Sequence, residues 1–263
     1  MRSGISTACL YPMLLEKSLS TLISMDFKLF EIFINTYSEL KNSYLKNLRK
    51  ITDENGCTVK SVHPFTSGYE GFLLFSDYER RFVDSLEFYK HYFDACNILG
   101  ADILVLHGKR KNKRDDLSED EYFERYLRMF ELGKTFGVTV AQENVNMFWS
   151  NGPLFIEHMK KFCKENCAFV LDIKQAVRGG EDPLEICRAM GNSIIHIHLN
   201  DNSRESDCLL PGKGSMDYGC LMKMLKSFGY GGDIIIEVYR KSFGELNELF
   251  AAKRNAERLA AVF

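Results

Sequence analysis

The chain has 263 residues, of which 45% are hydrophobic and 27% are charged. This composition is typical of a globular protein and excludes an intrinsically disordered chain, which lacks the apolar residues needed for a core. The 34 basic and 36 acidic residues give a net charge of −2, which argues against a globally basic nucleic-acid-binding protein. Because α/β barrels commonly use about 250 residues as one domain, we expect residues 1–263 to form a single domain.

The sequence favours a cytoplasmic protein without membrane segments. No stretch approaches the roughly 18 uncharged apolar residues that a membrane span requires. The apolar run near the N-terminus is interrupted by Pro12 and ended by Glu16, a pattern that does not suit a secretory signal. The eight cysteines are scattered along the chain, as in proteins whose cysteines stay reduced.

Short β-branched runs alternate with helix-like segments from one end of the chain to the other. Eight strands that alternate with helices predict a closed parallel (β/α)8 barrel, the TIM barrel. A doubly wound open sheet is the alternative, but it normally has a glycine-rich first turn, and residues 10–17 (LYPMLLEK) contain no glycine. In chain order, the strands are expected at 4–10, 27–34, 58–64, 102–108, 138–145, 168–175, 193–200 and 233–239, with helices between them such as Glu39–Arg49, Glu119–Phe136, Leu154–Cys163 and Tyr218–Phe228.

Acidic residues and a histidine close the last four predicted strands: Glu143, Asp172, His198 and Glu237. The carboxyl ends of barrel strands form the active-site face, and side-chain alternation allows these residues to point into one mouth. Each acid could instead cap a loop or pair with a separate base. Three carboxylates at one mouth repel one another unless a cation lies among them, so the pattern predicts one divalent metal ion. Oxygen-rich ligands with one nitrogen favour Mn²⁺, with Mg²⁺, Zn²⁺ or Co²⁺ as alternatives.

The segments around these four residues resemble the xylose-isomerase-like TIM-barrel superfamily, which includes sugar-phosphate isomerases, ketose 3-epimerases and apurinic endonucleases. The resemblance implies that the four residues bind one metal and that Glu143 and Glu237 are also the acid/base pair. The implied activity is isomerisation or epimerisation of a small sugar or sugar phosphate, by proton transfer through an enediolate. The sequence does not determine the oligomeric state, and a homo-oligomer is one possibility. The segments that carry the resemblance are QEN (142–144), LDI (171–173), HIHLND (196–201) and IIIEV (234–238).

Two further residues match substrate-contacting features of the same superfamily. Arg204 corresponds to an arginine that contacts substrate oxygens, with a solvated loop residue as the alternative. Lys213 lies in the LPGKG segment, which resembles a P-G-x-G loop and could bring the lysine to an anion.

The chain departs from the superfamily pattern at two places. Gln175 stands where members commonly have the histidine of D-x-x-H; it can bind a substrate hydroxyl but cannot titrate near pH 7. His63 and His107 match two metal ligands of the endonuclease branch, which uses three metals, but the Asp-x-His pair of that branch is missing, because residues 207–209 contain no histidine. We therefore expect both histidines to line a substrate pocket, with hydrogen-bonded structural histidines as the alternative. Nucleic acid is expected to be an unlikely partner. An endonuclease-like phosphodiesterase and a non-catalytic metal or sugar binder are the rival functions.

Other residues near the strand ends have both a functional and a structural interpretation. Trp149, together with Phe65 and Phe148, would form an aromatic wall for a sugar face, or would pack against a helix. The basic run at 109–114 would bind a substrate phosphate, or would be a solvated loop. His196 is expected one layer deeper than His198, where it would support a metal ligand instead of binding the metal.

Overall fold

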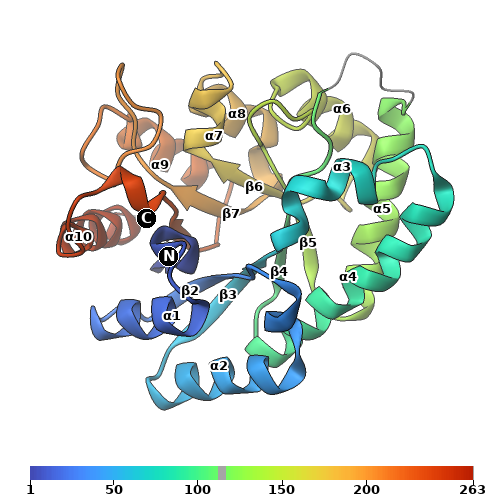
Figure 1. The fold of residues 1–263 in the computed structure, drawn as a ribbon. Helices are drawn as coiled ribbons and strands as arrows, with labels where there is room; N and C mark the ends of the chain where they lie inside the picture. The colour runs from blue at the N-terminus through green and yellow to red at the C-terminus, as the bar shows by residue number, and fades with distance from the viewer. Residues whose placement is uncertain (112–116, 263) are drawn as a thin grey trace.

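The computed structural model describes residues 1–111 and 117–262, and in it eight parallel strands close into a barrel (Figure 1). Each strand pairs with the next in chain order, and β1 pairs with β8 to close the ring. The predicted (β/α)8 fold is therefore confirmed. The strands are β1 Ser3–Ser6, β2 Leu29–Phe33, β3 Thr58–His63, β4 Ile103–Leu106, β5 Thr139–Glu143, β6 Phe169–Asp172, β7 Ile194–Leu199 and β8 Ile234–Ile236.

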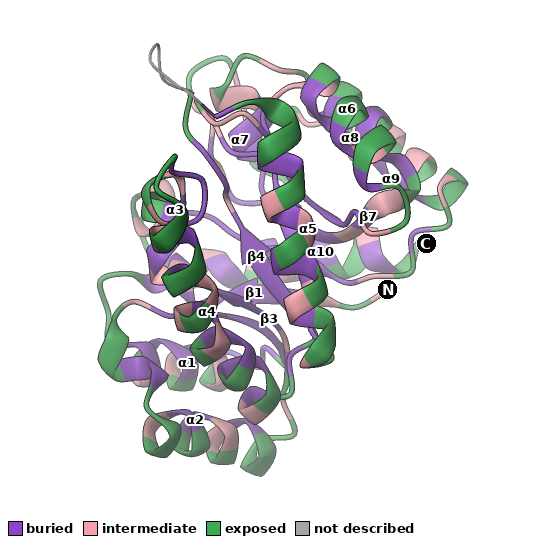
Figure 2. Cartoon of the chain, turned by 90° about the vertical axis from the view of Figure 1, so that its right-hand side faces the viewer, coloured by how far each residue is buried: buried purple, intermediate pink, exposed green. Residues whose placement is uncertain are grey.

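Helices surround the barrel and present their buried faces to the strands, which are buried almost throughout (Figure 2). Among the helices of the described ranges, none is long and apolar enough to cross a membrane. The helices are α1 Leu15–Ser24, α2 Asn42–Glu54, α3 Glu70–Leu73, α4 Glu79–Leu99, α5 Glu119–Thr135, α6 Pro153–Cys163, α7 Ile173–Arg178, α8 Pro183–Met190, α9 Tyr218–Ser227 and α10 Glu248–Ala261.

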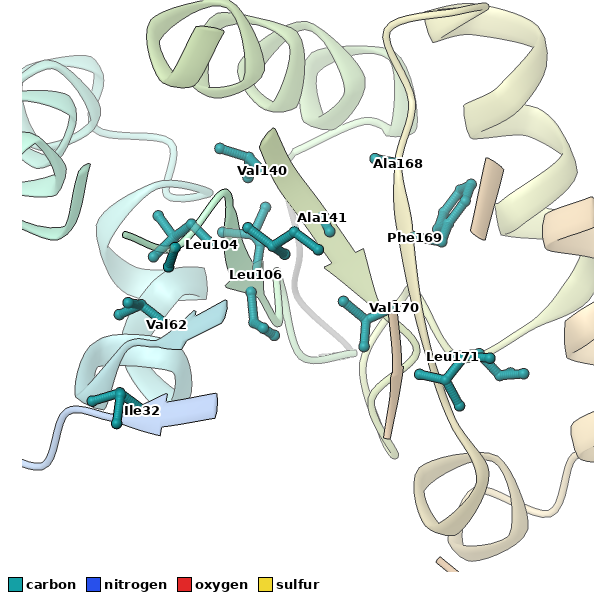
Figure 3. Close-up of a cluster of buried hydrophobic side chains, with 14 of the residues drawn as sticks. Ile32, Val62, Leu104, Leu106, Val140, Ala141, Ala168, Phe169, Val170 and Leu171 are labelled. Carbon is teal, nitrogen blue, oxygen red and sulfur yellow. The ribbon is translucent and has the colours of Figure 1, made fainter. Parts of the chain in front are cut away.

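The apolar core is continuous through the sheet and holds the strand positions. Side chains from several strands, such as Ile32, Val62, Leu104 and Phe169, are buried in one hydrophobic cluster (Figure 3). Because buried side chains pack closely, the strands have little freedom to move, and the residues at their carboxyl ends are fixed relative to one another.

The strands end earlier than the sequence patterns predict, and side-chain caps explain where. The predicted strand 168–175 is wrong beyond Asp172, whose Oδ1 accepts the Gln175 N–H at 3.1 Å and so starts α7. The first predicted strand, 4–10, ends at Ser6, whose hydroxyl accepts the Ala8 N–H at 3.3 Å and starts a short 3-10 turn. The helix expected at Glu39–Arg49 begins only at Asn42. The early ends place polar side chains at the rim of the barrel.

Candidate metal centre and substrate cavity

A cavity of about 410 Å³ opens at the carboxyl ends of the strands. Ligand pockets of roughly this size and larger accept small organic molecules. Its wall combines charged groups from the strand ends with aromatic and amide side chains from the loops. The lining includes Asn35, His63, Phe65, His107, Glu143, Lys174, Gln175, Glu237 and Tyr239.

The four residues predicted as metal ligands lie close together, and two of them, Glu143 and Glu237, line this cavity. Each offers one donor atom, and the four donor atoms lie within 4.8 Å of one another. His198 Nδ1 lies 3.4 Å from Glu143 Oε1, 3.5 Å from Asp172 Oδ2 and 3.3 Å from Glu237 Oε2. All four residues are buried.

This donor set fits a divalent cation. Three carboxylates and one imidazole nitrogen are ligands that Mn²⁺, Mg²⁺ and Zn²⁺ accept. Glu143 Oε2 is buried and accepts no hydrogen bond, although His107 Nε2 lies 2.9 Å away, so it retains lone pairs for a further partner. Asparagine side chains fix the rim: Asn144 exchanges hydrogen bonds with the Asp172 backbone, and Asn200 Nδ2 donates to Asp172 Oδ1 at 3.2 Å.

Glu31 of β2 lies behind His198 and orients it. Glu31 Oε2 lies 3.0 Å from His198 Nε2, and because a carboxylate can only accept, Nε2 carries the proton. That arrangement leaves Nδ1 of His198 to face the three carboxylates. The same Glu31 oxygen accepts from the Ser61 hydroxyl at 2.8 Å and lies 3.3 Å from His196 Nε2. A carboxylate–histidine pair of this kind commonly fixes the ring of a metal-binding histidine.

His63 and His107 lie on the other side of Glu143. Their Nε2 atoms are 3.0 Å apart, and both face Glu143 Oε2, at 3.7 Å for His63 and 2.9 Å for His107. The two histidines and Glu143 form a second group of potential ligand atoms that shares Glu143 with the first group. His63 is held in place by stacking on Phe33, with ring centroids 4.6 Å apart.

The charges of the cluster displace several pKa values. Burial alone would raise the pKa of Glu143, but the facing imidazoles of His107, His198 and His63 outweigh it and hold that pKa well below its usual range. Burial likewise opposes the ionised form of Glu31, yet His198 and His196 hold its pKa well below the usual range. Burial raises the pKa of Glu237 despite the nearby Lys174 and His198.

Lys174, which was not predicted as a site residue, lies within the donor cluster. It follows Asp172 on α7, is buried, and its ammonium group forms ion pairs with both Asp172 Oδ2 and Glu237 Oε2. Burial would lower the pKa of Lys174, but Asp172 and Glu237 outweigh it and raise that pKa well above its usual value. The side chain therefore stays charged.

The predicted substrate-binding residues divide into two groups. His63, His107 and Gln175 line the cavity, and Gln175 Oε1 accepts the Asn146 N–H at 3.2 Å. Trp149 does not line it; its ring stacks on Tyr122 of α5 with centroids 5.7 Å apart, so it packs against a helix. Phe65, another aromatic residue of the expected wall, does line the cavity.

Arg204 and Lys213 are exposed on the segment that follows β7, and neither is among the residues that line the cavity. Lys213 lies 3.5 Å from Glu248 of α10. The buried Asp201 carboxylate accepts the N–H groups of Gly212 and Gly214, at 3.0 Å each, and so fixes the loop that carries Lys213.

Only part of the basic run at 109–114 can be placed, because residues 112–114 lie outside the described residues. Lys109 is buried and donates to the Phe75 carbonyl at 3.3 Å, whereas Arg110 is exposed. Both line a separate cavity of about 400 Å³ together with Arg81. Phe148 lines that cavity too, and its ring meets the ring of His107 edge-on, with centroids 5.9 Å apart.

With this geometry established, comparison with known proteins identifies the class. The chain belongs to the xylose isomerase-like TIM barrel family, whose model matches residues 20–262. The resemblance drawn from the four strand ends is thus confirmed.

Individual relatives in this family are distant in sequence. An inosose dehydratase from Clostridium perfringens is 21% identical over 76% of this chain and 76% of its own. A D-tagatose 3-epimerase-like protein has a similar structure, with a TM-score of 0.79 and 19% identity over 100% of this chain and 98% of its own. The IolI protein, in a structure with a bound zinc atom, gives a TM-score of 0.77 and 16% identity over 100% and 99%. At these identities the structural matches show a shared fold.

Proposed function

We propose that this protein is a divalent-metal-dependent isomerase or epimerase of a small sugar or sugar phosphate. The observation that carries the proposal is the convergence of Glu143, Asp172, His198 and Glu237, whose donor atoms lie within 4.8 Å of one another; Glu143 and Glu237 also line a cavity of about 410 Å³. The activities named for its relatives, epimerisation of a ketose and dehydration of an inosose, use polyhydroxylated carbonyl compounds. The zinc atom bound in the IolI structure supports metal dependence.

The metal would be held by Glu143, Asp172, His198 Nδ1 and Glu237, and Mn²⁺ is our first candidate, with Mg²⁺, Zn²⁺ and Co²⁺ as alternatives. When bound, such an ion polarises the carbonyl and hydroxyl oxygens of a substrate and acidifies the neighbouring C–H. Glu31 would keep the Nδ1 atom of His198 directed at the ion through the 3.0 Å contact at Nε2.

Glu143 and Glu237 are the proposed acid/base pair. Glu143 is the last residue of β5, and Glu237 follows the last residue of β8. Two strands, β6 and β7, lie between β5 and β8 in the barrel, and both glutamates line the cavity. Their carboxylates therefore approach a substrate from different directions. One would remove a proton beside the carbonyl to give an enediolate, and the other would return a proton to the opposite face or to the neighbouring carbon.

Solvent-exchange experiments test this mechanism. Ketoses, aldoses, inososes and their phosphates would be incubated with the Mn²⁺-loaded protein in D₂O, and the product would be examined by NMR. We expect turnover of at least one substrate, with deuterium at the reacting carbon. Product without deuterium would favour a hydride shift between carbons, and the two glutamates would then act only as ligands. Tight sugar binding without turnover across the panel would favour the non-catalytic alternative.

A phosphorylated substrate is supported by the basic cavity beside the catalytic one. Arg81, Lys109 and Arg110 line it, and the Arg81 guanidinium donates to the Ser76 hydroxyl at 3.1 Å while it stacks on Phe72. Neutralising Lys109, Arg110 and Lys111 together should raise KM for a sugar phosphate but not for the corresponding free sugar. Equal effects on both sugars would mean that the loop does not bind substrate.

The eight cysteines are all free, which suits the reducing cytoplasm that we propose as the location.

A further inference from the structure

Lys174 lies where the negative charge of the site is concentrated. Its ammonium group is ion-paired with Asp172 and Glu237 at the same time, and its side chain is 2% exposed. Asp172 and Glu237 contact the ammonium group directly, and two further buried carboxylates, Glu143 and Glu31, both contact His198, which lies beside these two acids. Within residues 1–111 and 117–262, no other lysine or arginine forms an ion pair with any of them. Lys174 is thus the permanent cation of the cluster.

The ammonium group and a metal ion would use the same oxygen atoms. Asp172 Oδ2 and Glu237 Oε2, which contact Lys174, are also the oxygens 3.5 Å and 3.3 Å from His198 Nδ1 in the metal donor set. A divalent ion needs its carboxylate oxygens within about 2.0–2.6 Å, which leaves no room for a second cation on the same lone pairs. Two cations at such close range also repel strongly in a buried site.

We propose that Lys174 neutralises the site in the metal-free protein and that a divalent metal must displace its ammonium group in order to bind. The inference rests on the proposed metal site. Its consequence is a coupling: the lysine lowers metal affinity, and the metal releases the lysine. The released side chain has space available, because Lys174 lines the substrate cavity beside Gln175 and Tyr239.

Metal affinity tests the competition directly. Mn²⁺ binding to the wild type, Lys174→Met and Lys174→Gln would be measured by calorimetry or by competition with a fluorescent chelator. Coupled binding events commonly differ by about 5- to 150-fold, so we expect both variants to bind Mn²⁺ tighter by a factor in that range. Lys60→Met is the matched control, because Lys60 is a partly buried lysine on β3 that pairs with Asp102 at 2.9 Å, outside the cluster. The Mn²⁺ affinity of this variant should equal that of the wild type.

Displacement itself is visible by chemical labelling. Amine acylation followed by peptide mass spectrometry should show Lys174 protected in chelator and more reactive at saturating Mn²⁺, while Lys60 is unchanged. Thermal unfolding gives a second measurement. In chelator, Lys174→Met and Lys174→Gln should have a lower Tm than the wild type, and Mn²⁺ should raise the Tm of both variants by more than it raises the Tm of the wild type.

The possible outcomes separate this inference from the proposed metal site. Equal Mn²⁺ affinity in all variants, with Lys174 protected throughout, would overturn the displacement while leaving the metal site intact. Absence of Mn²⁺ binding from the wild type and from both Lys174 variants would overturn the metal site, and the displacement with it. Binding by the variants but not by the wild type would support the displacement.

Discussion

Two buried glutamates in this barrel, Glu143 and Glu70, have opposite electrostatic environments. At the strand ends, Glu143 is surrounded by imidazoles, and its pKa is held well below the usual range although burial opposes this. Glu70 of α3 is also fully buried, but its partners are neutral: Glu70 Oε2 accepts the Gly108 N–H at 2.6 Å, and Oε1 accepts the Tyr89 hydroxyl at 3.0 Å. Burial raises the pKa of Glu70 to about 8.

The difference shows that burial alone does not make a carboxyl group reactive or metal-binding. Neutral hydrogen bonds stabilise a carboxylate less than positive charges do, so Glu70 stays protonated up to neutral pH. At the strand ends the imidazoles that face Glu143 hold its pKa well below the usual range, and the ammonium group of Lys174 pairs with Asp172 and Glu237. We therefore expect substitutions at the strand ends to affect chemistry and metal binding, and substitution at Glu70 to affect stability.

The largest effect is expected for Glu237→Gln. Its amide oxygen can still coordinate a metal but cannot accept a proton, and general acid–base groups typically contribute 10²–10⁴-fold to rate. We expect kcat to fall by about 10³-fold while part of the Mn²⁺ binding is retained. Steady-state kinetics on any substrate found in the panel would measure this change. Unchanged kcat in a metal-loaded variant would remove Glu237 from the acid/base pair.

The next largest effect is expected on metal binding, which Asp172→Asn and His198→Ala should each weaken. Asp172→Asn replaces a charged ligand by a neutral amide, and His198→Ala removes a ligand, so both proteins should lose most of their bound Mn²⁺ in metal analysis after dialysis. Asp233→Asn is the matched control, because Asp233 lies just before β8, at its opposite end from Glu237, where it pairs with Arg2 at 2.7 Å. Full metal stoichiometry in both donor variants would exclude this site.

A smaller effect on the metal is expected from Glu31→Gln. Groups that orient a metal-binding histidine typically change affinity 10- to 100-fold, and we expect a loss of about that size. Glu31→Asp should recover part of it if the carboxylate acts by holding His198 Nε2. A structural role alone would instead lower Tm without moving Mn²⁺ affinity, so the two measurements together decide the role of Glu31.

The same comparison explains how much of the site could be predicted from the sequence. The clustering of Glu143, Asp172, His198 and Glu237 could be predicted because each lies at or next to a strand end, and the order of the strands brings these ends together. Glu31 was missed because it lies inside an apolar strand, where a single acid among LFEIF was the only signal. Lys174 was missed because the predicted strand extended to residue 175. The direction of its side chain depends on the start of α7 at Ile173, which the sequence pattern did not predict. Trp149 had two interpretations, and its contact with Tyr122 depends on a distant helix that no local pattern reveals.

The smallest effect, and the one that defines the other side of the comparison, is the pH dependence of Glu70. Its pKa is raised from an ordinary 4.5 to about 8, so between these values the folded protein holds a proton that the unfolded chain has released. The free energy of unfolding therefore loses up to about 1.4 kcal/mol per pH unit over this window, and the loss stops above pH 8. Glu70→Gln cannot ionise, so its stability relative to the wild type should improve steadily from pH 5 to pH 8 and then level off. Urea unfolding at several pH values would measure the difference, with the exposed helical Glu54→Gln as the control that should show no such trend. A wild-type and Glu70→Gln difference that is constant across pH 5 to 8 would mean that Glu70 is ionised in the folded protein, and that a cation shields it as it does at the strand ends.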